Sequence, residues 1–96
     1  LQRISELFDR FPEYRIRVEG HAVNLSGTER EENEELVPLS LARAQTVRDS
    51  LIELGVAPGR VTAIGRGGRD PIVPHSDEAN RWKNRRVDFV LLRGGR

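Results

Sequence analysis

Residues 16–24 read IRVEGHAVN, and residues 39–47 read LSLARAQTV. The first stretch alternates apolar and polar residues and is rich in β-branched side chains, which predicts a half-buried strand over Tyr14–Glu19. The second stretch spaces its apolar residues along one helical face, and we expect this helix to begin at Pro38–Ser40 and to end at Leu54. A strand that leads through a loop into a helix favours an α/β arrangement.

Arg43 falls in the first turn of this expected helix. A cation there works against the helix dipole by up to about 1 kcal/mol, so an acidic residue would be the more stable choice. Arg43 also precedes Val47 by four residues, and we expect it to lean toward the buried side. A guanidinium beside free N–H groups is suited to a carboxylate or a phosphate. The alternative is that Arg43 pairs with a glutamate upstream and only ties the loop down.

The rest of the chain predicts two further strands and one more helix. An amphipathic helix is expected first, ended by Pro12, and Gly55 is expected to end the main helix. The further expected segments are a helix at Leu1–Phe11, a turn at Val56–Arg60, a strand at Val61–Ile64, an irregular segment at Arg69–Asn80 ending in a short helical turn, a strand at Asn84–Leu92 and a frayed tail at Arg93–Arg96. This order predicts an α/β fold of the α+β two-layer sandwich kind, with both helices on one face of a small mixed sheet.

The composition limits the classes of function. Ninety-six residues make one domain, and 16 basic residues against 15 acidic ones leave a net charge of +1. This balance does not match a nucleic-acid-binding protein, which would carry a basic excess. The absence of cysteine excludes disulfides and thiolate sites. No apolar run approaches the roughly 20 residues of a membrane span, and no signal peptide is visible, so we expect a piece of a longer protein.

The connection over residues 24–38 is rich in acid. It is expected either as a flexible loop or as a loop whose early part adds a helical turn, and a solvated charged surface is the favoured interpretation. Its acidic residues are Glu29, Glu31, Glu32, Glu34 and Glu35.

Other candidate sites carry little weight. The spacing of Gly65, Gly67 and Gly68 fits neither the P-loop nor the dinucleotide fingerprint. His21 and His75 come from distant segments without ligand-spaced carboxylates, so no metal site is expected, and His21 is interpreted as hydrogen-bonded and structural. No nucleophile, base and orienting group share one geometry, which argues against an enzyme, and no cofactor is expected.

Four blocks in this order together resemble a known family, the OmpA-like C-terminal domain. The blocks are IRVEGH at 16–21, LSLARA at 39–44, GRG at 65–67 with Pro71 after it, and NRRVDF at 84–89. The resemblance runs from about Phe8 to Leu92 and implies the two-layer fold. It also implies non-covalent binding of the stem peptide of peptidoglycan, at its diaminopimelate residue, in the periplasm or at the periplasmic face of an outer membrane.

The resemblance implies that Arg43, in the Leu-Ser-x-x-Arg-Ala motif, binds the carboxylate of the ligand. The family motif Gly-His-Thr-Asp supplies an aspartate for the ligand's ammonium, whereas here Ala22 stands at the threonine position and Val23 at the aspartate position. An ammonium left without an acceptor costs about 1–3 kcal/mol or more. Either the domain has lost wall binding and serves as a structural or protein-interaction domain, or one of the acidic residues of the connection replaces the aspartate.

The last expected strand opens with Asn84, Arg85 and Arg86. Asn84 is expected to cap a turn and reach the pocket, and one arginine to line the pocket while the other pairs with Asp88 or Glu19. Trp82 is interpreted as cover for the edge of the core. The full set of candidate ligand-binding residues is Arg43, Asn24, Val23, Ala22, Leu39, Asn84 and Arg85. The expected partners are the peptidoglycan stem peptide and proteins of the cell envelope, with no nucleic acid and no transmembrane segment.

Overall fold

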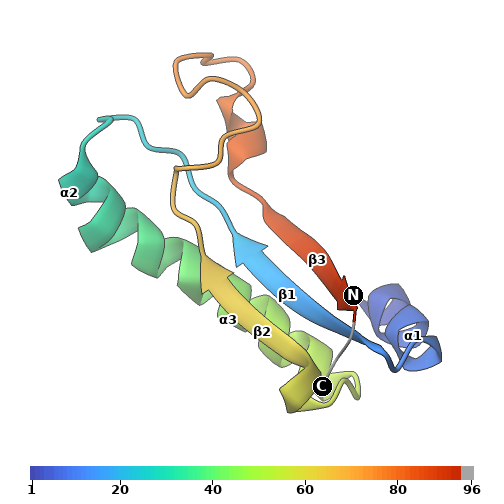
Figure 1. Ribbon diagram of the computed structural model, residues 1–96. Helices are drawn as coiled ribbons and strands as arrows, with labels where there is room; N and C mark the ends of the chain where they lie inside the picture. The colour runs from blue at the N-terminus through green and yellow to red at the C-terminus, as the bar shows by residue number, and fades with distance from the viewer. Residues whose placement is uncertain (94–96) are drawn as a thin grey trace.

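The computed structural model describes residues 1–93, which form two layers (Figure 1). One layer is a sheet of three strands and the other is helical. The elements in chain order are α1 (Gln2–Arg10), β1 (Tyr14–Gly20), α2 (Glu29–Glu31), the π-helical turn η1 (Glu32–Leu36), α3 (Val37–Glu53), the 3-10 turn η2 (Pro58–Arg60), β2 (Val61–Gly65), the 3-10 turn η3 (Arg81–Asn84) and β3 (Val87–Arg93). Among residues 1–93, the helices lack the length and the apolar composition that a membrane span requires.

Strand β1 is the centre of the sheet, whose order is β2-β1-β3. It pairs in parallel with β2 and antiparallel with β3, so that Val18 lies between Ala63 and Phe89. Because side chains alternate along a strand, Ile16 and Val18 share the face that meets the helices. The sheet is therefore mixed, as the sequence predicts.

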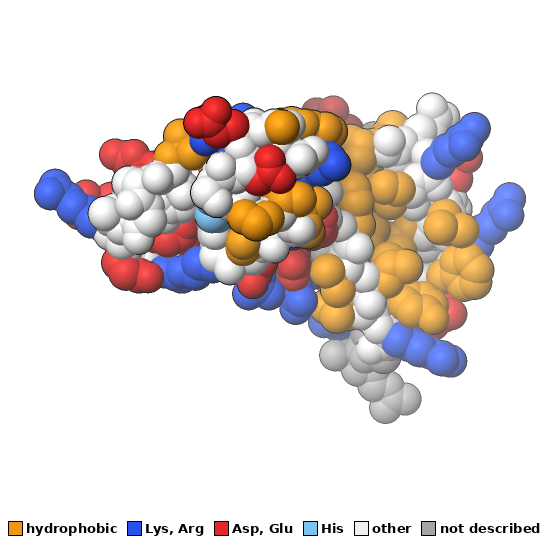
Figure 2. Space-filling model, turned by 90° about the horizontal axis from the view of Figure 1, so that it is seen from above, with side chains coloured by type: hydrophobic (Ala, Val, Ile, Leu, Met, Phe, Trp, Pro, Cys, Tyr) orange, Lys and Arg blue, Asp and Glu red, His pale blue; other side chains and the backbone are white. Residues whose placement is uncertain are grey.

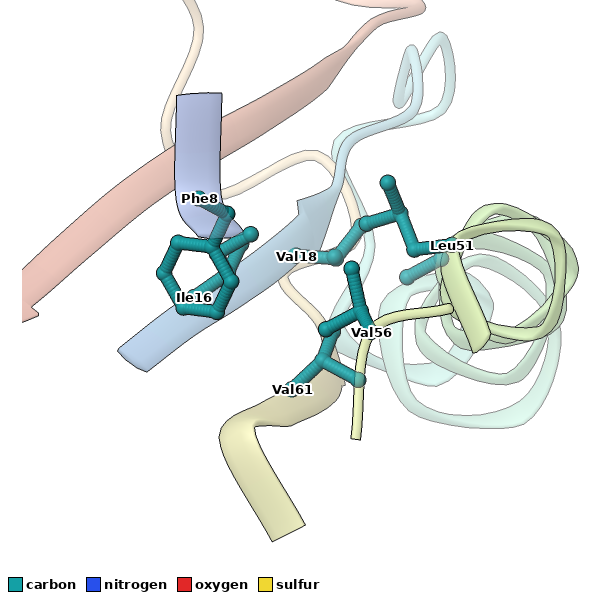
Figure 3. Close-up of a cluster of buried hydrophobic side chains, with 7 residues drawn as sticks. Phe8, Ile16, Val18, Leu51, Val56 and Val61 are labelled. Atoms are coloured by element: carbon teal, nitrogen blue, oxygen red, sulfur yellow. The ribbon is translucent and has the colours of Figure 1, made fainter. Parts of the chain in front are cut away.

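The core lies between this sheet face and helix α3 (Figure 3). Val18 from β1 and Leu51 from α3 are completely buried, and burying one such side chain contributes about 1.5–3 kcal/mol. The buried cluster consists of Phe8, Ile16, Val18, Ala44, Leu51, Val56 and Val61.

Helix α1 joins the same layer through its contacts with the end of α3. The Ser5 hydroxyl donates a hydrogen bond to the Leu54 carbonyl over 3.1 Å. The Arg60 guanidinium lies 3.8 Å from the centre of the Phe8 ring and donates to the carbonyl of Tyr14 over 3.0 Å. The prediction of two helices on one face of a small mixed sheet is confirmed.

The start of the main helix differs from the prediction. The helical run begins at Glu29 rather than at Pro38, and it continues through η1 into α3. The Thr28 hydroxyl caps this start by accepting a hydrogen bond from the Glu31 N–H. The acidic residues of the first turn stabilise the helix further, because their negative charges interact favourably with the positive end of the helix dipole. The acidic segment is therefore mostly helical, and the interpretation of it as a flexible loop is wrong.

Pro38 explains the π-helical turn rather than a helix start. Proline has no N–H, and its ring crowds the carbonyl four residues before it, here that of Glu34. In η1 the hydrogen bond of Val37 reaches back five residues to the Glu32 carbonyl, which widens the helix just ahead of the proline. Arg43 consequently lies in the middle of the helical run, and the predicted place in a first turn is wrong.

The remaining boundaries shift by a few residues. Gly55 ends the helix with a φ of +107°, as expected of a glycine in this position. The last strand begins at Val87 rather than Asn84, and the short helical turn forms at Arg81–Asn84. Arg93, expected in the tail, pairs with Tyr14 in the sheet, and residues 94–96 lie outside the described residues.

Candidate functional site

A shallow hollow of about 280 Å³ opens where β3 begins and helix α3 passes it. Arg43 reaches it from α3, Arg85 from the end of η3, and Arg86 and Val87 from the start of β3. We call this feature the cationic hollow, because three of its four lining side chains are arginines. Two of the predicted site residues, Arg43 and Arg85, are thus brought together from positions far apart in the sequence.

Arg43 is exposed rather than turned toward the buried side, as its spacing from Val47 predicted. It makes no hydrogen bond and no ion pair with residues 1–93, so the alternative in which it ties down an upstream glutamate is not seen either. A helical residue covers the surface near its own turn, and the core side of this turn is filled by Ala44. The guanidinium of Arg43 is therefore available to an anion from outside.

Arg85 and Arg86 have different roles. The Nε atom of Arg86 donates to both carboxylate oxygens of Asp88 over 3.1 Å, and its Nη2 atom donates to the Asp70 carbonyl over 3.0 Å. Arg85 is exposed and has no ion pair with the described residues. Arg86 therefore pairs with Asp88, one of the two partners expected for an arginine here, while both arginines line the cationic hollow.

The chemistry of the cationic hollow is that of an anion site. Its lining contains three guanidinium groups and one valine, and no carboxylate. A guanidinium binds a carboxylate or phosphate through two parallel hydrogen bonds, and it stays charged at all physiological pH values. None of the four side chains that line the hollow can accept a hydrogen bond from an ammonium.

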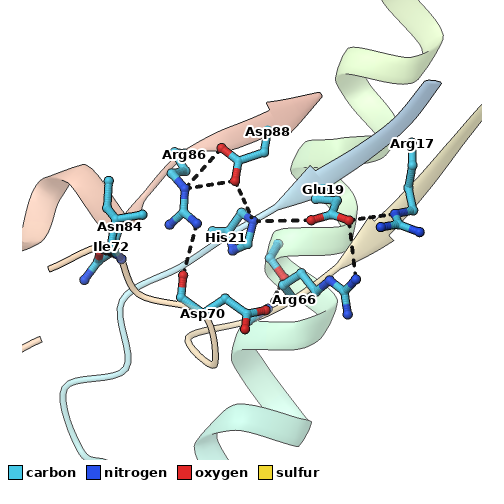
Figure 4. A network of polar contacts seen from close by, with 11 residues as sticks. Arg17, Glu19, His21, Arg66, Asp70, Ile72, Asn84, Arg86 and Asp88 are labelled. Carbon is cyan, nitrogen blue, oxygen red and sulfur yellow. Dashed lines mark hydrogen bonds and ion pairs between the residues drawn. The ribbon is translucent and has the colours of Figure 1, made fainter. Parts of the chain in front are cut away.

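Behind Arg86 lies a network of polar groups around the buried ring of His21 (Figure 4). The Nε2 atom of His21 is 3.2 Å from the Asp88 carboxylate and 3.9 Å from that of Glu19. Although these contacts are close, neither ring nitrogen has a partner in hydrogen-bond geometry. The prediction of a structural His21 holds in that the ring is 2% exposed, but the expected hydrogen bond is not formed.

The charges of this network are balanced by arginines. Burial lowers the pKa of His21, and the nearby Arg86 guanidinium lowers it further, against the opposite effect of the Asp88 and Glu19 carboxylates. Burial alone would raise the pKa of Glu19, but hydrogen bonds from Arg17 and Arg66 outweigh it and hold this pKa below its usual range. The fold therefore favours the neutral form of the His21 imidazole and the ionised form of the Glu19 carboxyl.

The residues at the end of β1 are buried. Ala22 and Val23 are 3% and 7% exposed, and the Ala22 N–H donates to the Gly67 carbonyl over 2.8 Å. Asn24 is also buried, and its side chain holds the following turn by donating to the Thr28 carbonyl and by accepting from the Gly27 N–H. Asn24 thus shapes the loop, and none of these three residues lines the cationic hollow.

Glu32 has a role that the sequence did not reveal. It is 3% exposed, and its Oε1 atom accepts hydrogen bonds from the Asn24 amide over 3.2 Å and from the Gly68 N–H over 2.7 Å. A Cβ atom at Gly67, where φ is +59°, would lie 2.2 Å from the other carboxylate oxygen of Glu32. The glycines after β2 therefore leave room for this carboxylate. In the sequence, the glycines at 67 and 68 are the signal that a side chain such as Glu32 packs against this loop.

The proposed replacement of the missing aspartate by an acid of the connection is not supported by this arrangement. Glu32 is committed to the loop contacts, Glu31 contacts the Ser26 hydroxyl, and Glu34 pairs with Arg30. None of the five acidic residues of this segment lines the cationic hollow.

Asn84 and Leu39 do not line the hollow either. Asn84 is completely buried, and its amide oxygen accepts from the N–H groups of Ile72 and Val73, while its amide nitrogen contacts the Val73 carbonyl and His75. These four contacts use the whole capacity of an asparagine amide, so the expected reach of Asn84 into the pocket is wrong. Leu39 is 46% exposed on α3, away from the hollow.

Trp82 does not cover the core. Its side chain is 61% exposed on η3, so the interpretation of Trp82 as cover for the core edge is wrong. The turn projects from the end of the sheet, beyond the core.

A second hollow, of about 210 Å³, lies at the other end of β1 and is lined by Ile4, Leu7, Phe8, Phe11, Tyr14 and Leu91. It lacks charged groups and is distinct from the cationic hollow.

No cluster of three or more histidine, cysteine or acidic side chains in residues 1–93 is arranged to hold a metal ion.

The profile of the OmpA family matches residues 1–85. The chain belongs to the OmpA family. The family that the four sequence blocks resemble is thereby confirmed.

Curated relatives of this OmpA-family domain include proteins named for peptidoglycan. The peptidoglycan-binding protein ArfA of Mycobacterium tuberculosis is 33% identical over 91 residues, which are 95% of this chain and 26% of ArfA. The peptidoglycan-associated lipoprotein of Agrobacterium fabrum is 36% identical over 91 residues, which are 95% of this chain and 49% of the lipoprotein. The chain thus spans about a quarter to a half of the length of these relatives.

A solved structure supports the OmpA-like fold. The crystal structure of the peptidoglycan-associated lipoprotein from Burkholderia pseudomallei matches with a TM-score of 0.78 at 28% identity, and the match covers 95% of this chain and 73% of that chain. The names of these relatives describe binding and association rather than catalysis.

Proposed function

We propose that this domain binds peptidoglycan without a covalent bond, by holding a carboxylate of the stem peptide in the cationic hollow. The observation that carries the proposal is the meeting of Arg43 and Arg85 in one hollow, each exposed and without an ion pair among residues 1–93. The names of the related ArfA and peptidoglycan-associated lipoprotein give the ligand class.

The geometry suits a carboxylate better than a cation. Hydrogen bonds to charged groups contribute about 1.5–3 kcal/mol each, and an arginine forms two of them to one carboxylate. Arg86 is anchored on Asp88 and on the Asp70 carbonyl, so it adds positive charge to the hollow without moving. Arg43 and Arg85 are left to close on the ligand from α3 and from η3.

A second function is favoured by Val23. This side chain is apolar and 7% exposed where the family motif carries an aspartate, and the hollow itself holds no carboxylate. A ligand with a free ammonium would lose about 1–3 kcal/mol for want of an acceptor. The alternative is a domain that keeps the OmpA fold as a structural or protein-interaction module and no longer binds the wall.

The proposed location follows from the proposed ligand. Peptidoglycan lies in the cell envelope, so we place the domain there, at the periplasmic face of an outer membrane, as an anchor for the protein that contains it. Its further partners would be other envelope proteins. The proposed role is binding, with no catalytic step.

The experiment is co-sedimentation of the domain with purified, insoluble peptidoglycan. The unchanged domain is compared with Arg43→Ala and with Arg3→Ala, which removes the same charge from exposed α1 at the other end of β1. We expect Arg43→Ala to weaken binding about tenfold to a hundredfold and Arg3→Ala to leave it unchanged. Circular dichroism of each variant shows that the fold is kept.

A Val23→Asp variant separates the two functions. If the unchanged domain stays in the supernatant and only Val23→Asp sediments, the structural alternative is correct and wall binding has been lost. If both Arg43→Ala and the unchanged domain sediment equally, the hollow is not the site. Release of soluble wall fragments during the incubation would contradict the non-catalytic role.

A further inference from the structure

Trp82 is the only tryptophan of the chain, and its exposure is unusual for so large an apolar side chain. It is 61% exposed on η3, and Ile72 in the neighbouring segment is 59% exposed. Figure 2 looks down on the end of the molecule formed by residues 69–84 and shows hydrophobic side chains in the open among charged ones. This end also holds the residues that open β3.

The turn that carries Trp82 is held firmly. Asn84, completely buried in the same turn, ties it to the backbone of Ile72 and Val73 through hydrogen bonds of 2.9–3.2 Å. The Arg81 N–H donates to the Asp77 carbonyl over 2.8 Å. The indole is thus presented on a turn that its own backbone and Asn84 fix, which lowers the entropic cost of using it to bind a ligand.

The backbone of Trp82 is bonded to that of Arg85, a residue that lines the cationic hollow. The Arg85 N–H donates to the Trp82 carbonyl over 3.1 Å and closes the 3-10 turn. Side chains three residues apart lie over one another on such a turn, so Trp82 and Arg85 share one side of it. Trp82 does not itself line the hollow, but Arg85 does, so a ligand that extends from the hollow past Arg85 would reach the indole.

We propose that Trp82 is a stacking platform for a sugar ring of the glycan strand to which the stem peptide is attached. This inference rests on the proposed function, because the cationic hollow would hold the peptide part. An indole face packs against the apolar C–H face of a pyranose, and its N–H can donate to a hydroxyl. Lys83, whose Nζ atom lies 5.7 Å from the ring centre, supplies a further donor for sugar hydroxyls.

The sole tryptophan makes the test direct. Intrinsic fluorescence and calorimetry are recorded with three soluble ligands: the disaccharide–peptide unit of peptidoglycan, the free stem peptide, and the disaccharide alone. We expect the disaccharide–peptide to bind about threefold to tenfold more tightly than the free peptide and to shift the tryptophan emission more strongly. A Trp82→Ala variant, measured by calorimetry, is expected to bind both peptides equally, at the affinity that the unchanged domain has for the free peptide.

Two controls sharpen the result. Trp82→Phe keeps an aromatic face and is expected to keep part of the preference for the disaccharide–peptide, whereas Leu7→Ala removes an exposed apolar side chain at the far end and is expected to keep all of it. If the unchanged domain binds the free peptide and the disaccharide–peptide equally, the platform is refuted while the proposed function stands. If it binds neither, the proposed function fails and the platform with it.

Discussion

The Glu32 carboxylate accepts a hydrogen bond from the Gly68 N–H over 2.7 Å, and this contact joins the first turns of the long helix to the loop after β2. The same oxygen accepts from the Asn24 amide at the end of β1. One buried side chain therefore holds together three segments around the end of the sheet.

Replacing Glu32 is expected to destabilise the domain. Glu32→Ala leaves the donors of Asn24 and Gly68 without their acceptor, and the free energy of unfolding should fall by about 1.5–3 kcal/mol. Glu32→Gln keeps an oxygen in place and should cost less. Urea unfolding measures both, with Glu35→Ala as the exposed control, which should change the stability by less than about 0.5 kcal/mol. Equal effects of Glu32→Ala and Glu35→Ala would contradict this role.

Gly20 is expected to be irreplaceable at the contact between β1 and α3. A Cβ atom there would lie 1.9 Å from the backbone oxygen of Ser40, so strand and helix would have to move apart. We expect Gly20→Ala to cost about 3 kcal/mol or more, or to prevent folding. Gly59→Ala is the matched control, because nothing lies within 4 Å of a Cβ at that position. Thermal unfolding of the two variants compares them, and a Gly20→Ala domain as stable as Gly59→Ala would refute the close approach.

Arg85 and Arg86 are adjacent, but replacing Arg86 should lower the stability of the domain, whereas replacing Arg85 should lower its affinity for the ligand. Arg86→Ala removes the hydrogen bonds to Asp88 and to the Asp70 carbonyl, and should lower the free energy of unfolding by about 1–3 kcal/mol. Arg85→Ala breaks no ion pair seen in the described residues and should change stability by less than about 0.5 kcal/mol. Under the proposed function, Arg85→Ala should instead weaken binding to peptidoglycan. Chemical denaturation and co-sedimentation of the same two proteins separate these effects.

Acidification is expected to destabilise the domain in two steps. The pKa of His21 is lowered by folding, so the unfolded chain binds the proton first, and stability falls as the pH drops below the ordinary value of 6.5. The pKa of Glu19 is also lowered, so its contribution is present above 4.5 and is lost below that pH. The melting temperature should be level from pH 8 to pH 7 and decline between pH 6.5 and pH 5.

His21→Gln tests the first step. The glutamine amide does not titrate, so the melting temperature of the variant should decline less between pH 6.5 and pH 5, whatever its stability at pH 7. An equally steep decline in the variant would show that another group controls the stability in this range.

The sheet and the core follow from the sequence because their pattern is local. The alternation of Ile16 and Val18 with charged residues and the helical spacing of Ala44 and Leu51 both identify the side that becomes buried, and all four residues are at most 1% exposed. Each pattern shows which face of its own strand or helix meets the core. It does so without information on the loops that connect the elements.

The sequence predicts the wrong start for the main helix because two signals compete. Proline favours the first turn of a helix, so Pro38 indicates a start there. Thr28 followed by Glu31 is also a helix-start pattern, and in the structure the Thr28 hydroxyl does cap Glu31. The π-helical turn resolves the conflict, because it lets the helix pass through Pro38. Rules that use only the neighbouring residues do not give the free-energy cost of a π-helical turn, so they cannot decide between the two starts.

The candidate site was predicted only in part for a similar reason. Short motifs identify Arg43 and Arg85 as candidates, but their meeting in one hollow depends on how the whole fold places α3 relative to the start of β3. Asn84 and Asn24 were expected at the ligand and instead hold the backbone, because a buried amide must satisfy all its polar atoms. Trp82 was expected near the core and is exposed because its turn lies beyond the end of the sheet.

The central position of β1 has a mechanical consequence for an anchoring domain. The cationic hollow lies near the Gly20 end of β1, whereas Leu1 and Arg93 both lie near its Tyr14 end (Figure 1). A force between a wall-bound ligand and either of these residues would run along the strands, at right angles to the hydrogen bonds of the sheet. Those bonds would then carry the load together in shear rather than separate one after another.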